Sequence, residues 1–140
     1  MQLHPDYPVV EDAYQMTKEW TVTLPTRFNR RMEEGDLVIW KPGFTIWTVV
    51  WGNDQNLSQE ERLVWIKDES SPSCYDEITE ESDGITRYAY RLKEYSEDDR
   101  LPAFYCYAFG NLGHVQMAIY FDSEEDIADA MAIWRSLAES

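Results

Sequence analysis

Short runs in which hydrophobic and polar residues alternate occur along the first half of the chain, and this is the pattern of strands with one buried face. Residues 20–24 show the alternation, residues 36–40 form a second strand-like run, and residues 44–51 are apolar on both parities. A Pro-Gly pair, the composition of a tight turn, separates the last two runs. We therefore expect a strand over 20–24 that ends at Pro25, a helical turn over 26–34, and then a hairpin whose second strand lies centrally in a sheet.

Three more strand-like runs follow in the second half, over residues 85–92, 103–109 and 114–121. The last two flank the sequence Gly-Asn-Leu-Gly at 110–113, which predicts a hairpin turn. Residues 68–84 are polar and acidic, and we predict a long loop there. The pattern as a whole predicts an antiparallel sheet of about six strands.

Two helices complete the expected fold. Ser58 followed by Glu61 has the spacing of a capping box and predicts a helix to about Lys67. A second cap-like spacing begins at Ser123 and precedes a C-terminal helix, whose apolar stripe we expect to be buried against the sheet. The stripe consists of Ile127, Ala130, Met131, Trp134, Leu137 and Ala138. We predict one α+β domain over residues 1–140, with an N-terminal arm at about 1–10.

Several of these features together resemble the PsbP-like fold. They are Leu24-Pro25 after the first strand, the Trp-rich hairpin, the Ser-capped middle helix, and Phe121 leading into Ala130 and the segment 133–137. The resemblance implies an αβα sandwich. It also implies partner binding, since a photosystem subunit, a Ran-binding import factor and bacterial chaperones of secreted toxins share that fold. No functional residue transfers, because the similar positions are structural.

The charge of the chain restricts its partners. It has 27 acidic and 12 basic residues, for a net charge of −15. Phosphate backbones and anionic membranes are repelled by such a field, whereas a basic protein surface is attracted. We therefore expect a protein partner with a basic surface, and neither nucleic acid nor membrane. The N-terminal segment lacks the pattern of a secretory signal, and Cys74 and Cys106 are expected to be reduced, so we predict a cytoplasmic protein.

Catalytic and cofactor motifs are missing from the sequence. The two histidines, His4 and His114, are far apart, and no Gly-x-Ser-x-Gly elbow, phosphate-binding loop or Cys-x-x-Cys pair occurs. The acidic segment lacks the alternation of a calcium loop, so we interpret it as solvated. We predict no enzyme activity, no catalytic residue, no metal and no cofactor.

Two surfaces are candidates for partner binding. One is acidic and consists of Tyr75, Asp76, Glu77, Glu80, Glu81, Asp83, Glu97, Asp98 and Asp99. The other would be a sheet face that mixes tyrosine and arginine, the residue types enriched in interface hot spots. It consists of Arg87, Arg91, Tyr105, Tyr107, Gln116 and Tyr120. Alternatively, a helix covers that face and the arginines pair with nearby acids.

Size, acidity, aromatic content and missing catalytic motifs favour a small binding protein of the bacterial immunity type, which neutralises a cognate toxin. One alternative is a chaperone or adaptor for a secreted effector, which would hold apolar helices. A second is a small-ligand binding protein or an enzyme of a kind the motifs do not reveal. The tryptophans are expected in the core, notably Trp40, Trp47, Trp51 and Trp65.

Overall fold

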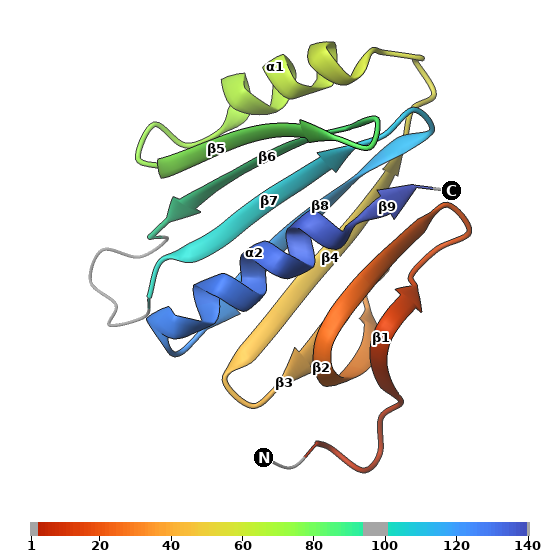
Figure 1. Ribbon diagram of the computed structural model, residues 1–140, viewed down its shortest axis with the longest axis vertical. Helices are drawn as coiled ribbons and strands as arrows, with labels where there is room; N and C mark the ends of the chain where they lie inside the picture. The colour runs from red at the N-terminus through yellow and green to blue at the C-terminus, as the bar shows by residue number, and fades with distance from the viewer. Residues whose placement is uncertain (1–2, 94–100, 140) are drawn as a thin grey trace.

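One antiparallel sheet dominates the computed structural model, which describes residues 3–93 and 101–139 (Figure 1). Within these residues the order across the sheet is β1-β2-β3-β4-β8-β7-β6-β5, and β9 pairs with the start of β2. The strands are β1 (Val9–Gln15), β2 (Trp20–Glu33), β3 (Asp36–Lys41), β4 (Phe44–Gly52), β5 (Tyr75–Ser82), β6 (Ile85–Leu92), β7 (Ala103–Phe109), β8 (Gly113–Phe121) and β9 (Ala138–Glu139). The sheet therefore consists of two four-stranded meanders that join where β4 pairs with β8.

The expected αβα sandwich with about six strands is wrong. The described residues form nine strands in a single sheet, and the helices are short. They are α1 (Gln59–Glu69) and α2 (Ile127–Ser136), the second preceded by the single 3-10 turn η1 (Glu124–Asp126). The segments that we expected to be a helical turn and a loop contain strands instead, and β1 begins at the end of the expected N-terminal arm.

The strand β2 does not end at Pro25. Its pairing with β1 is irregular around this residue, because Asp12 lies opposite Leu24 whereas Val10 lies opposite Phe28. A proline, which has no N–H to donate, is tolerated at such an irregularity. The chain continues as a strand through the expected helical turn, where the Phe28 side chain is fully buried in the core.

The expected acidic loop contains β5, an edge strand paired with β6. Asp83 and Gly84 form the hairpin turn between them, and their φ angles are 55° and 77°. Two consecutive positive φ angles are typical of the Asp-Gly type I′ turn, whose twist matches that of the strands. The Asp83-Gly84 dipeptide is therefore the feature of the sequence that indicates the β5–β6 hairpin.

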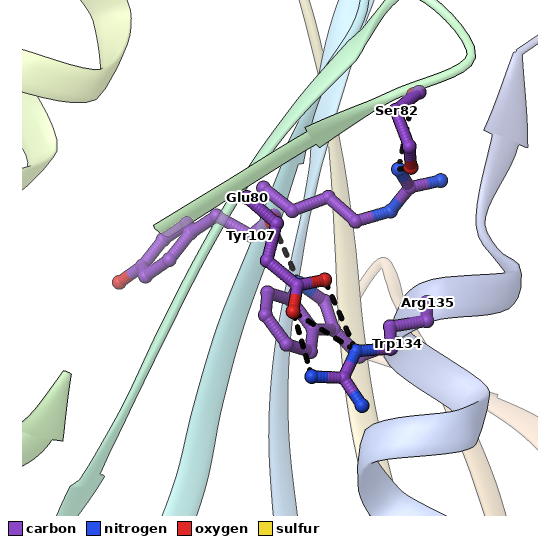
Figure 2. A network of polar contacts seen from close by, with 6 residues as sticks. Glu80, Ser82, Tyr107, Trp134 and Arg135 are labelled. Carbon is purple, nitrogen blue, oxygen red and sulfur yellow. Dashed lines mark hydrogen bonds and ion pairs between the residues drawn. The ribbon is translucent and has the colours of Figure 1, made fainter. Parts of the chain in front are cut away.

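The two helices lie on opposite faces of the sheet, as Figure 1 shows, with α2 across one face and α1 along the β5–β6 side of the other. The larger core lies under α2, where Trp134 and Leu137 are fully buried and Ile127 and Met131 are partly buried. The predicted stripe is thus confirmed for these four residues. The Trp134 indole Nε1–H donates to the carbonyl oxygen of Tyr107 at 2.9 Å, which ties α2 to β7 (Figure 2).

Helix α1 begins as predicted. Ser58 and Glu61 form a full capping box, in which the Ser58 hydroxyl accepts from the Glu61 amide and the Glu61 carboxylate accepts from the Ser58 amide. Ile66 packs on a second, smaller cluster of buried side chains with Tyr88 and Phe109. Neither helix in the described part of the chain is long and apolar enough to cross a membrane.

Candidate functional site

The acidic candidate surface lies on the edge strand β5 and its turn. Asp76, Glu77, Glu81 and Asp83 are exposed there, together with Tyr75. Because β5 is the last strand of the sheet on its side, these side chains border a backbone edge that pairs with no other described strand. The remaining acids of this candidate, Glu97, Asp98 and Asp99, lie outside the described residues.

Glu80 is not part of that free surface. Its carboxylate accepts from the Arg135 guanidinium, with Nη2 at 2.6 Å and Nε at 3.0 Å from its oxygens (Figure 2). Hydrogen bonds from Arg135 hold the pKa of Glu80 below its usual value. Glu77 also has an internal role, since it accepts from the hydroxyl group of Tyr88 at 2.5 Å. The strand thus uses one acid to bind α2 and another to bind β6.

The tyrosine and arginine residues of the second candidate lie on opposite faces of the sheet. Tyr107 pairs with Tyr88 on one side and with Gln116 on the other, and directly opposite residues share a face. Arg87 lies opposite Ala108, on the other parity. The structure therefore places Tyr105, Tyr107, Gln116 and Tyr120 on the α1 face, and Arg87 and Arg91 on the α2 face.

Both arginines are buried and serve the fold. Arg87 donates to the Ser82 hydroxyl at 2.7 Å and to the Leu137 carbonyl at 2.8 Å. Arg91 pairs with Glu124 at 2.5 Å and donates to the Pro102 carbonyl. The expected sheet face that mixes tyrosine and arginine does not exist. Side chains alternate along β6, so Arg87 and Arg91 lie on the α2 face and the tyrosines on the α1 face.

A groove with a volume of about 810 Å³, here called the α1 groove, lies between α1 and the sheet face that carries the tyrosines. Its lining comes from α1, the end of β4 with the following loop, and strands β6, β7 and β8. The residues that matter for its chemistry are Trp51, Trp65, Tyr90, Tyr107, His114 and Gln116. Sequence reasoning did not identify this site, because its parts lie on five separate segments.

Trp51 and Trp65 give the groove its aromatic character. Their side chains are 50% and 52% exposed, so the expectation that both lie in the core is wrong. Trp51 is near the end of β4 on the α1 face, directly opposite His114, and a polar run from Asn53 follows it. Trp65 precedes the buried Ile66 on α1 and therefore lies beside the helix's inward face. Ring contacts continue from Trp51 into the floor of the groove.

His114 forms part of that floor. It pairs with Trp51 across β4 and β8, and the two rings stack with centroids 6.2 Å apart. The His114 side chain is buried, and its Nδ1 finds no hydrogen-bond partner among the described residues. Burial, helped by the charge of Arg62, lowers the pKa of His114 to about 4, which keeps the ring neutral near pH 7.

Arg62, which lines the groove, anchors α1 to the sheet. It is buried and donates to the carbonyl oxygens of Gly113, at 2.9 Å, and Gly110 in the β7–β8 turn. The carboxylate of Glu139 accepts from the amides of Asn111 and Leu112 in the same turn. Burial lowers the pKa of Arg62, and the charge of Glu139 acts in the opposite direction. The guanidinium is thus held by protein groups.

The rim of the groove is acidic. Asp54 and Glu69 line it, and both are exposed. Among the described lining residues, Arg62 carries the one positive charge, and it lies beneath the surface. Cys74 and Cys106 are free thiols that do not line the groove. An aromatic groove with an acidic rim is suited to a cation.

Comparisons with protein-family models, curated proteins and solved structures found no match to this chain.

Proposed function

We propose that this protein is a binding module of the bacterial immunity type, which neutralises a cognate toxin by covering a basic surface on it. The observation that supports the proposal most directly is the row of exposed carboxylates along β5. Asp76, Glu77, Glu81 and Asp83 lie together at one edge of a protein whose net charge is −15. A basic partner is steered toward such an edge and held with a defined orientation.

Charge on an edge strand can also serve solubility alone, because it discourages edge-to-edge aggregation. Solubility alone, however, does not need the acids to gather at one edge. The helix α1, next to this edge, adds the exposed residues Glu60, Glu61, Asp68 and Glu69. The negative field therefore extends from the edge strand over a neighbouring element.

Capture of the partner from the native cell tests this function. The tagged protein would be purified at low salt and again after mild cross-linking, and the captured proteins identified by mass spectrometry. We expect one stoichiometric partner with a basic surface, released as salt is raised. A protein that stays monomeric and captures nothing under both conditions contradicts the proposal.

The identity of the captured region separates this function from that of a chaperone or adaptor. A toxin neutralised in its folded state presents a charged surface and loses its activity in the complex. A chaperone client instead presents apolar helices and needs an apolar docking surface of several hundred Å². Loss of toxin activity on addition of this protein, at equimolar ratio, is the expected result.

A further inference from the structure

We infer that the α1 groove is the hot spot of the interface and takes an arginine or lysine side chain of the basic partner. The inference rests on the proposed function, because it specifies how that partner is recognised. It adds a site on the α1 face to the acidic edge at β5.

The walls of the groove supply aromatic faces. Trp51 and Trp65 are each about half exposed and line the same concavity, with Tyr90 and Tyr107 beneath. A cation over the face of an aromatic ring is attracted by the ring's quadrupole, and tryptophan gives the strongest attraction. Two half-exposed tryptophans from separate elements, α1 and β4, thus form the sides of a site for a flat or compact cation.

The charges around the groove have the matching sign. Asp54, in the loop after β4, and Glu69, at the end of α1, are exposed and line the groove. The repulsion between Arg62 and a bound cation is reduced by two features. The Arg62 guanidinium donates to the carbonyls of Gly110 and Gly113, and its charge is offset by Glu139. A phosphate or carboxylate ligand would meet the acidic rim instead and be repelled.

A polar group on the floor can accept from a cation. The side-chain carbonyl oxygen of Gln116, which lines the groove, accepts from the Trp51 indole at 3.4 Å and has a second lone pair for a guanidinium or ammonium group. The Nδ1 atom of His114 lies below the accessible surface, so a ligand in the groove does not contact it.

A neutral sugar is the rival occupant, because sugars also stack on tryptophan. Asp54 and Glu69 can accept hydrogen bonds from its hydroxyl groups, but a neutral sugar gains no charge attraction from them or from the overall charge. The test must therefore vary the charge of the ligand while keeping its shape.

The experiment uses the full chain labelled with ¹⁵N and a capped hexapeptide of alternating glycine and arginine. The control peptide has citrulline, a neutral isostere, in place of each arginine, and a cellulose hexasaccharide serves as the neutral sugar. Binding is followed through the indole N–H signals of Trp51 and Trp65, which are assigned with Trp51→Phe and Trp65→Phe. We expect the arginine peptide to shift both signals, and the citrulline peptide and the sugar to leave them in place.

Two variants test the residues. Trp51→Ala and Trp65→Ala remove half-exposed rings, and each should weaken binding of the arginine peptide about tenfold. Met32→Ala is the matched control, because Met32 is 61% exposed on β2 and does not line the groove. Unchanged affinity in both tryptophan variants overturns the inference, as does equal binding of the citrulline peptide or binding of the sugar alone.

The same variants distinguish failure of the inference from failure of the proposed function. If the captured partner binds Trp51→Ala and Trp65→Ala as tightly as the wild type, the function stands and the groove is not its hot spot. If no basic partner is captured but the arginine peptide shifts the two indole signals, the cation site stands and the proposed function is wrong.

Discussion

Gly113 on β8 approaches the carbonyl oxygen of Trp51 on β4 so closely that a Cβ atom at position 113 would overlap it. The obstacle is backbone, which cannot rotate away as a side chain does. Gly113 also lies directly opposite Gly52, so the two strands meet here through glycines. This close approach fixes the end of the β4–β8 pair that carries Trp51 and His114.

Replacing Gly113 with alanine should therefore force the strands apart. We expect Gly113→Ala to lower the free energy of unfolding by about 2 kcal/mol or more, the cost of overpacking at a rigid contact. Gly52→Ala is the matched control, since its Cβ would lie 3.6 Å from Asp54 Oδ1 and the change should cost less than about 0.5 kcal/mol. Urea unfolding of both variants measures the difference, and equal midpoints would contradict the prediction.

The lowered pKa of His114 should make stability depend on pH. Its pKa is about 4 in the folded protein and 6.5 when unperturbed, so between these values the unfolded chain binds more protons. Stability is then fully present above about pH 6.5 and falls as the pH drops toward 4, by up to about 3 kcal/mol from this residue. Urea unfolding at several pH values checks this, and His114→Phe should flatten the profile over that range. An unchanged slope in His114→Phe would assign the pH dependence to other groups.

The ion pair between Glu80 and Arg135 should contribute modestly and lose its effect in acid. Both side chains are partly exposed, at 31% and 47%, so solvent screening limits the coupling to about 0.5–1 kcal/mol. Because the folded pKa of Glu80 is lowered, the stabilisation is present above its unfolded pKa and is lost as the pH falls through the folded one. A double-mutant cycle with Glu80→Gln and Arg135→Gln, measured at neutral and acidic pH, tests both statements; coupling that persists at acidic pH refutes the second.

Neutralising the edge strand should affect association and not folding. The variant changes Asp76, Glu81 and Asp83 to the matching amides and spares Glu77 and Glu80, which bind Tyr88 and Arg135. Exposed substitutions of this kind move stability by less than about 0.5 kcal/mol each. Binding to the captured partner should become slower and less sensitive to salt, because charge steers encounter over about 8 Å at physiological ionic strength.

Stopped-flow association at two ionic strengths supplies the measurement for this variant. Glu34→Gln is a control, since Glu34 is an exposed acid in the turn after β2, away from β5. An unchanged association rate and salt dependence in the three-residue variant would move the recognition surface away from β5.

Much of the sheet could be predicted from alternation, but β1, the second half of β2, β5 and β9 could not. β3, β4, β6, β7 and β8 alternate or are apolar throughout, and they lie where we expected them. In β2, Pro25 was taken as an end signal, yet the irregular pairing with β1 accommodates it. In β5 the outward side chains are acidic, and an edge strand has so little burial that its hydrophobic pattern almost disappears. The Asp83-Gly84 turn was the better indicator.

The site was harder to predict because it depends on which face each strand presents. Local alternation correctly separated Arg87 from Tyr88, but only the register between β6 and β7 shows that Tyr107 faces Tyr88 and that the arginines lie under α2. Likewise, nothing local distinguishes a core tryptophan from Trp51 or Trp65. Their exposure follows from where α1 packs, which is decided by Arg62 and the β7–β8 turn.

The joining of the two meanders at β4 and β8 has a consequence for synthesis on the ribosome. β4 is made long before β8, and in the interval its second edge has no strand to pair with. The strand itself carries Phe44, Ile46 and Trp47, whose large side chains lie on its two faces. An unpaired apolar edge recruits other chains. The nascent protein is thus most prone to aggregate just before its last long strand emerges, when β4 is complete and the sheet is still open through its middle.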